Sequence, residues 1–508
     1  MTGQHPPATP ILPGFHPDPT ICRVGEDYCL ATSSFEYFPG APIWHSPDLL
    51  HWNQIGHILD RRSQFSRGRG LSSTGLYAGT LRHHAGLCHY VTTNVGGDEP
   101  GQILVTATDP AGPWSDPVHI PDAEGIDPDL AWDEAGACYL TWKALSFGEG
   151  EIGIRQARLD TTTGALLDEP YPVWQGSGLA AAEGPHLYAV RGRWYLLLAE
   201  GGTERGHAVT IARGPSPAGP FAACPANPIL THRSSIDPVQ NTGHADLVET
   251  STGEWAAVYL GVRPLGSTPG FHVLGRETFL AGVDWRDGWP VVDEARYAVP
   301  PMATVFTDDF SGPALGPHWV VPGGEPAAAA DLVPGGGLRL HPPGDHRGGS
   351  TGLLCTRIRD LRWSAEAVFE GDGRFLVRVD DRHHYGLERR GAEVVVPARI
   401  GDLDSVIARA PVPAGPVLLR IAALDPATPQ VPFGHAGPDN IVLGLGGPEP
   451  SDLARLDGRY LSTEVASGFT GRMLALGATE RPAAVRSLTY RPEPAPGSDA
   501  PARRPDGE

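Results

Sequence analysis

Short apolar runs separated by turn residues dominate the N-terminal part of the chain. Five of them are apolar at most positions, which is typical of strands buried on both faces. They cover residues 27–35, 87–95, 137–145, 193–200 and 254–262. Helical periodicity is scarce here, so this part of the chain is predicted to consist of β-strands.

A looser repeat accompanies these runs and couples a turn rich in Pro, Gly and Asp to an aromatic residue. It occurs at residues 45–52, 106–117, 212–221 and 281–290. An aromatic side chain after each turn can fill the gap between radially packed sheets. Self-similarity at a spacing of several tens of residues is typical of a β-propeller, and the number of units predicts five blades.

The pattern changes near Pro300. From residue 306 onward the strands alternate between apolar and polar positions, which predicts half-buried antiparallel strands and a β-sandwich of the concanavalin or jelly-roll kind. We therefore predict an all-β protein with a propeller at residues 9–302 and a sandwich at residues 303–490. Residues 491–508 have few apolar side chains and several prolines, and we expect a disordered tail there.

Composition narrows the classes of function. The 508 residues include 65 Gly and 52 Pro, and 39 basic against 59 acidic residues give a net charge of −20. Without a basic stripe, nucleic acid and anionic membranes are poor partners. Lys143 is the one lysine, and its surroundings match neither a phosphate-binding loop nor a Schiff-base site. Both a monomer and a homo-oligomer remain open.

The cysteines and the N-terminus indicate the cellular compartment in which the protein is expected. Six dispersed cysteines show no zinc-like spacing, so we expect reduced, buried thiols. The N-terminus lacks the charged and apolar regions of an export signal, and no apolar run approaches the length of a membrane span. The chain is expected to be cytoplasmic.

Three acidic motifs lie at the edges of predicted strands. They contain Asp18 in FHPDPTI, Asp127 in EGIDPDL and Glu183 in AAEGPHLY. Each alone is typical of an ordinary turn, but the first strands of propeller blades converge on the central channel. Clustered carboxyls raise one another's pKa, so one can donate a proton while another activates water, as glycosidases require. The chain has no HExxH motif, which argues against metal hydrolases of that kind.

On these residues the sequence resembles glycoside hydrolase family 43, specifically β-xylosidases and α-L-arabinofuranosidases with a C-terminal β-sandwich. The resemblance covers about residues 9–490. Besides the acidic motifs, it rests on the segments 31–52, 242–248 (TGHADLV), 274–279 (LGRETF) and 457–471 (DGRYLSTEVASGFTG).

The resemblance implies a role for each acidic residue. Asp18 is the general base, Glu183 is the general acid, and Asp127 orients Glu183 and tunes its pKa. It also implies inversion of configuration, which needs the base and the acid roughly 6.5–9.5 Å apart to leave room for water.

The resemblance assigns two further polar residues. Arg276 is expected to hold sugar hydroxyls and neighbouring carboxylates. His244 is expected at the propeller centre, where in many relatives it touches a hydrated calcium ion. We expect no required cofactor and leave a structural calcium ion at the propeller centre open.

Aromatic residues are expected to shape the pocket. Phe35 resembles a wall of the innermost subsite, Tyr77 stands in the aromatic position of a neighbouring subsite, and Phe469 resembles a sandwich residue that reaches the rim. Gly79 stands where relatives usually have proline, and the freer backbone of glycine changes the expected shape of that subsite.

The leading hypothesis is an exo-acting glycosidase that removes terminal β-1,4-xylose from small oligosaccharides. The alternative is removal of α-L-arabinofuranose. A hypothesis from another class is a non-catalytic carbohydrate-binding propeller, which has no need of a matched acid and base. A retaining fructosidase-type propeller would require NDPN-like and Arg-Asp-Pro motifs, which the sequence lacks.

Overall fold

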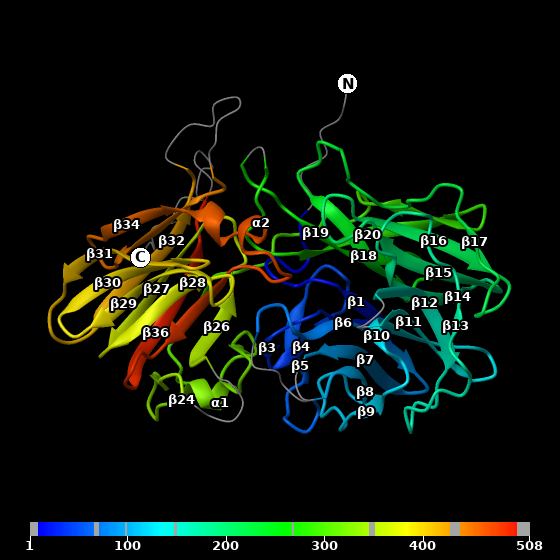
Figure 1. Cartoon of the computed structure of the whole chain (residues 1–508), viewed down its shortest axis with the longest axis horizontal. Coiled ribbons are helices and arrows are strands. Elements are labelled where there is room, and N and C mark those ends of the chain that lie inside the picture. Colours follow the sequence, from blue (N-terminus) through cyan, green and yellow to red (C-terminus); the bar gives the residue numbers. More distant parts are fainter. Residues whose placement is uncertain are drawn as a thin grey trace, which may run out of the picture.

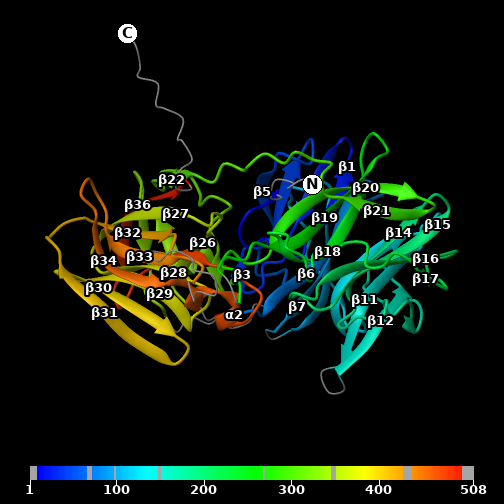
Figure 2. The same ribbon diagram turned by 90° about the horizontal axis from the view of Figure 1, so that it is seen from above.

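The computed structural model describes residues 9–65, 71–96, 99–146, 150–266, 269–344, 351–426 and 437–494. Two β-rich domains lie side by side in it, with the N-terminal domain on the right of Figure 1 and the C-terminal domain on the left. The view from above shows the same arrangement (Figure 2).

The N-terminal domain is a five-bladed β-propeller, as predicted, and each blade is a four-stranded antiparallel sheet. The first blade contains β1 (Thr20–Val24), β2 (Asp27–Ala31), β4 (Gly40–Ser46) and β5 (Asn53–Leu59). The second contains β6 (Gly75–His84), β7 (Leu87–Val95), β8 (Gly101–Ala107) and β9 (Val118–Ile120). The third contains β10 (Gly125–Trp132), β11 (Cys138–Ser146), β12 (Gly150–Arg158) and β13 (Tyr171–Pro172). The fourth contains β14 (Glu183–Val190), β15 (Arg193–Glu200), β16 (Ala208–Gly214) and β17 (Ala222–Ala223). The fifth contains β18 (Gln240–Glu249), β19 (Trp255–Val262), β20 (Glu277–Arg286) and β21 (Trp289–Asp293).

The five apolar runs of the sequence are the second strands of the five blades: β2, β7, β11, β15 and β19. A second strand is flanked by its own blade on both edges and by neighbouring blades on both faces, which explains why most of its positions are apolar. β2 ends at Ala31, so the last part of the predicted run 27–35 is not strand.

The aromatic residues of the repeated turns pack between blades, as predicted. Trp52 of the first blade lies in a core cluster with Val258 of the fifth. Trp114 of the second blade packs with the first, and Phe221 of the fourth packs against residues of the third. Each turn thus supplies a wedge that fills the widening space between radial sheets.

The propeller ring closes between the two ends of its chain. The amide and carbonyl of Leu12 exchange two hydrogen bonds of 3.2 Å with Thr278 of β20. The amide of His16 donates to the carbonyl oxygen of Arg276 at 3.0 Å. The segment before the first blade is therefore fixed against the fifth.

The C-terminal domain is a sandwich of two antiparallel sheets. One contains β22 (Phe306–Asp308), β24 (Ala330–Leu332), β25 (Leu338–Leu340), β27 (Trp363–Glu370), β32 (Val417–Leu424), β33 (Asn440–Leu445), β34 (Ser451–Asp457) and β36 (Ala483–Pro492). The other contains β26 (Leu353–Arg357), β28 (Gly373–Arg378), β29 (His383–Arg390), β30 (Glu393–Ile400), β31 (Leu403–Pro411) and β35 (Met473–Gly477). Their facing side chains form one apolar core, which includes Phe369, Leu419, Phe375 and Leu476.

The helices are short, and the end of the chain differs slightly from the prediction. They are α1 (Pro326–Ala329), the 3-10 helix η1 (Gly458–Leu461) and α2 (Thr463–Ala466). In the described part of the chain, no helix is long and apolar enough to cross a membrane. β36 continues to Pro492, past the predicted start of the tail at residue 491, and residues 495–508 lie outside the described residues. All six cysteines are free and buried, as predicted.

Main-chain and side-chain contacts join the two domains. The two-residue strand β3 (Tyr37–Phe38) leaves the first blade and pairs with β23 (Val321–Pro322). From the sandwich, Arg357 Nε donates to the carbonyl of Phe15 at 2.7 Å, and Arg378 Nη1 donates to the hydroxyl of Tyr37 at 2.8 Å. These are buried contacts beside an apolar cluster shared by both domains.

A chain that ends at Met302 should aggregate, because loss of the sandwich exposes the apolar face around Phe15 and Tyr37. Size-exclusion chromatography of the soluble fraction tests this. A chain ending at Pro494, which keeps both domains, is the control and should remain soluble. A soluble and monomeric propeller would contradict the expectation.

Candidate active site

One pocket at the propeller centre brings together every site residue predicted from the sequence. Its lining consists of Asp18, Phe35, Tyr77, Ala78, Ile126, Asp127, Glu183, Thr203, His244, Arg276 and Phe469. The first strands of the second to fifth blades supply Tyr77, Asp127, Glu183 and His244, while Asp18 lies two residues before the first strand of the first blade. Convergence of the inner strands thus gathers residues that are far apart in the sequence.

A repeated backbone irregularity aims these side chains into the pocket. Asp18, Asp127 and His244 have φ angles of 52°, 55° and 45°. Gly184, which follows Glu183, has a φ of 54°. The registers of β10, β14 and β18 shift at these positions. Non-glycine residues rarely adopt positive φ, and such bulges next to a site re-aim side chains.

Asp18 lies in a setting that favours its ionised form. Arg276 Nη1 donates to Asp18 Oδ1 at 2.7 Å, and the hydroxyl of Ser33 donates to Asp18 Oδ2 at 2.7 Å. Burial by itself would raise the pKa of Asp18, but Arg276, His244 and Ser33 outweigh burial and lower it. Asp18 is therefore a carboxylate at neutral pH, as a general base must be.

Asp127 and Glu183 lie in a setting that favours protonation. Burial raises the pKa of Asp127 well above its ordinary value, and the nearby carboxyls of Glu183 and Asp18 raise it further. Burial also raises the pKa of Glu183. Asp127 Oδ2 accepts a hydrogen bond of 3.1 Å from the amide of Gly184, which fixes the backbone directly after Glu183. This contact fits the predicted orienting role of Asp127.

Lys143 is a functional candidate that the sequence analysis set aside. Its Nζ donates to Glu183 Oε2 at 3.2 Å, and its side chain is only 6% exposed. It extends from β11, the second strand of the third blade. The available signal in the sequence was that Lys143 is the one lysine of the chain, but nothing in its local motif connects it to Glu183.

The charged groups of the pocket nearly balance. Two cations, Arg276 and Lys143, face the three carboxyls, while burial lowers the pKa of His244 to about 4 and keeps its imidazole neutral. Two cations balance two of the three carboxyl groups in their ionised form. A pocket with no net charge therefore holds one proton on its three carboxyl groups. Because Arg276 pairs with Asp18, that proton belongs to the pair formed by Asp127 and Glu183.

Aromatic rings form one wall of the pocket. The ring of Phe35 lies 5.1 Å from that of Tyr77 and stacks on that of Phe469 at 5.5 Å between centroids. The amide of Phe469 donates to the hydroxyl of Ser73 at 2.8 Å, so a residue of the sandwich is anchored on the propeller. Such a wall can pack against the CH groups of a sugar ring.

Gly79 is required by a close approach and not by backbone freedom. A Cβ atom at this position would lie 2.5 Å from the hydroxyl of Tyr90 and 2.7 Å from the carbonyl of Val91. The space beside Gly79 is thus filled by Tyr90, a contact that the sequence alone does not reveal.

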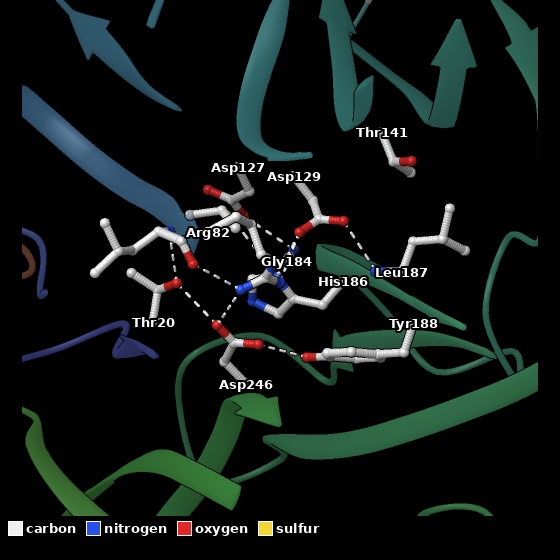
Figure 3. Close-up of polar contacts among 12 residues, drawn as sticks. Thr20, Arg82, Asp127, Asp129, Thr141, Gly184, His186, Leu187, Tyr188 and Asp246 are labelled. Carbon is white, nitrogen blue, oxygen red and sulfur yellow. Dashed lines mark hydrogen bonds and ion pairs between the residues drawn. The ribbon is translucent and has the colours of Figure 1, made fainter. Parts of the chain in front are cut away.

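Beneath the pocket, a buried polar network is centred on Arg82 (Figure 3). Arg82 donates to Asp129 Oδ1 and to Asp246 Oδ2, each at 2.7 Å, and lies 3.0 Å from Nδ1 of His186. The hydroxyl of Thr20 also donates to Asp246 Oδ2 at 2.8 Å. Arg82 thus contacts the third, fourth and fifth blades directly, and Thr20 joins the first blade to the network through Asp246.

The two carboxylates of the central network are not arranged to ligate a calcium ion directly. Calcium takes six to eight oxygen ligands, but Asp129 and Asp246, the carboxylates of the central network, are both bonded to Arg82. Among the residues that the structure describes, no three His, Cys, Asp or Glu side chains are arranged to hold a metal ion. The guanidinium of Arg82 thus supplies the positive charge between these two carboxylates.

The fold and the pocket define a class of protein. A propeller that combines a carboxyl held ionised, two carboxyls with raised pKa values and an aromatic wall in one pocket has the groups that glycoside cleavage requires. Comparison with protein families agrees. Residues 7–290 match the model described as glycosyl hydrolases family 43, and residues 307–487 match that of the β-xylosidase C-terminal concanavalin A-like domain.

Individual relatives cover one or both domains. A xylosidase/arabinosidase of Butyrivibrio fibrisolvens is 46% identical over 56% of each chain. A non-reducing end α-L-arabinofuranosidase of Bacteroides ovatus is 35% identical over 92% of this chain and 90% of its own. The chain belongs to glycosyl hydrolase family 43, as the sequence motifs predicted.

Solved structures of the same family extend over both domains. The GH43B protein of the Bacteroides ovatus xyloglucan PUL has a TM-score of 0.85 and 32% identity, covering 96% of this chain and 100% of that one. The xylan β-1,4-xylosidase of Bacillus halodurans has a TM-score of 0.83 and 28% identity, with the same coverage.

Arg82→Met should destabilise the protein, because it leaves two buried carboxylates facing each other without a cation. Removal of one partner from a buried ion pair typically costs about 3–5 kcal/mol, so the Tm measured by calorimetry should fall by several degrees. Arg82→Lys keeps the charge but not the forked geometry, so its Tm should lie between those of the unsubstituted protein and Arg82→Met. Chelation of divalent ions should leave the Tm of the unsubstituted protein unchanged. A normal Tm for Arg82→Met, or a loss of stability on chelation, would contradict this account.

Proposed function

We propose that this protein is an exo-acting, inverting glycosidase that removes a terminal β-1,4-linked xylose from short oligosaccharides. The observation that carries the proposal is the pocket itself, in which Asp18 is held ionised while Asp127 and Glu183 have raised pKa values. An enzyme that must supply a base and an acid at the same pH needs this difference between its carboxyls.

The proposed reaction is a single displacement. Asp18 accepts a proton from a water molecule as the water oxygen bonds to the anomeric carbon. Glu183 donates its proton to the glycosidic oxygen as the bond between that oxygen and the anomeric carbon breaks. The sugar leaves with inverted configuration, and proton exchange with water restores the two carboxyls.

The pocket wall supports action at a chain end. Phe469 stacks on Phe35 and is anchored through Ser73, so the sandwich closes one side of the pocket. Arg276, which binds Asp18, also donates to the hydroxyl of Thr203 at 3.2 Å and faces the same space. A pocket that is closed on one side by the sandwich and has an aromatic wall favours a single terminal sugar over the middle of a polymer.

Removal of α-L-arabinofuranose is the second candidate. The Bacteroides ovatus relative that spans both domains is named a non-reducing end α-L-arabinofuranosidase, whereas the Bacillus halodurans relative with comparable structural similarity is named a xylan β-1,4-xylosidase. Both sugars are pentoses with similar hydroxyl groups, and the same acid and base serve both.

The rates on 4-nitrophenyl β-D-xylopyranoside and 4-nitrophenyl α-L-arabinofuranoside test the proposal. We expect kcat/KM to be higher for the xyloside, on the order of ten-fold, since small differences in fit within one pocket have effects of this size. Asp18→Asn, which keeps the shape of the side chain, should lose activity on both substrates. A preference for the arabinofuranoside would support the second candidate, and no hydrolysis of either substrate would contradict the glycosidase proposal.

A further inference from the structure

None of the site roles predicted from the sequence involves Lys143, and the fold does not require a lysine at this position. It lies on β11 opposite Ile126 of β10 and Ile154 of β12. From there its side chain reaches Glu183 of the next blade, with 3.2 Å between Nζ and Oε2. Burying an ammonium group is costly unless it is paired, and the carboxyl that it faces is the proposed acid.

Several charged or titratable groups face Glu183 or line its pocket. Lys143 and Arg276 are the cations, and Asp18 and Asp127 are the other carboxyls. Tyr77 and His244 complete the set: burial raises the pKa of Tyr77 and lowers that of His244, so both are neutral near pH 7. Arg276 is committed to Asp18 at 2.7 Å, which leaves Lys143 as the cation in direct contact with Glu183.

We propose that Lys143 is a positioning residue that holds the carboxyl of Glu183 toward the pocket and sets the pH at which Glu183 loses its proton. The proposal rests on the proposed function of Glu183 as the acid. The ammonium group favours the carboxylate that forms when Glu183 donates its proton. It opposes the effect of burial, which by itself would hold the proton too tightly.

The sign of the effect follows from the charge. Glu183 must be protonated to act, so activity falls as the pH rises through the pKa of the Asp127–Glu183 pair. Lys143 lowers that pKa. Loss of the ammonium group should therefore move the alkaline limb of the pH profile to higher pH. It should also weaken proton donation, because the carboxyl of Glu183 is no longer held in place.

The pH dependence of kcat/KM for Lys143→Met tests the proposal on the full-length protein, with 4-nitrophenyl β-D-xylopyranoside, 4-nitrophenyl α-L-arabinofuranoside and xylobiose as substrates. The alkaline limb of the Lys143→Met profile should move to higher pH by about one pH unit. At neutral pH, kcat/KM should fall by about ten-fold on xylobiose and by less on the nitrophenyl glycosides, whose leaving group needs little protonation. Lys143→Arg, which keeps the charge, should restore the limb to within a few tenths of a unit.

Two further variants separate positioning from mere stability. Thr141→Val on the same strand removes a hydroxyl that accepts a hydrogen bond from Gln156, so it perturbs β11 and should leave the limb in place. In a Glu183→Gln background, Lys143→Met should change the rate on the nitrophenyl glycosides by less than about two-fold, because residues that act as a unit are not additive.

The outcomes are distinct. An unmoved limb in Lys143→Met, or an Arg variant that behaves like the Met variant, would overturn the role of Lys143 while leaving the glycosidase proposal intact. An unsubstituted protein that is inactive on all three substrates would instead overturn the proposed function on which this inference rests.

Discussion

The contact between Asp18 and Arg276 is the constraint on which the site depends. The two residues lie 258 positions apart in the chain, and they meet because the segment before the first blade pairs with the last blade. That pairing closes the propeller ring and at the same time gives Asp18 the guanidinium that keeps it ionised. The pairing that closes the ring therefore also sets the electrostatics of the pocket. A propeller that failed to close would not hold Asp18, its proposed base, against Arg276.

The fold and the predicted site residues were accessible from the sequence because they depend on local and repeated signals. A second strand is apolar at most positions, and the turn aromatics recur in four of the five blades, so the blades could be counted. The acidic motifs could be assigned to one centre because Asp127 and Glu183 lie within the first three residues of equivalent inner strands. The positive φ angles of Asp18 and Asp127 show the physical reason for these motifs: an irregular backbone followed by proline aims each carboxyl inward.

The rest of the site could not be predicted, because it consists of contacts between blades. Arg82 has no local motif, yet its guanidinium joins Asp129 and Asp246 at the propeller centre. Lys143 lies in an ordinary buried strand, and its partner is forty residues away on the next blade. Gly79 was interpreted through backbone freedom, whereas the neighbouring Tyr90 is what requires it. In each case the deciding partner is known only once the blades are packed.

The configuration of the first sugar released tests the central claim most directly, because it reports whether Asp18 activates water or forms a covalent bond. Proton NMR of the unsubstituted enzyme acting on 4-nitrophenyl β-D-xylopyranoside, recorded before mutarotation, distinguishes the two anomers. The account predicts that α-xylose appears first and that β-xylose grows in later. Initial release of β-xylose would mean a covalent intermediate and would contradict the assignment of Asp18 as a general base.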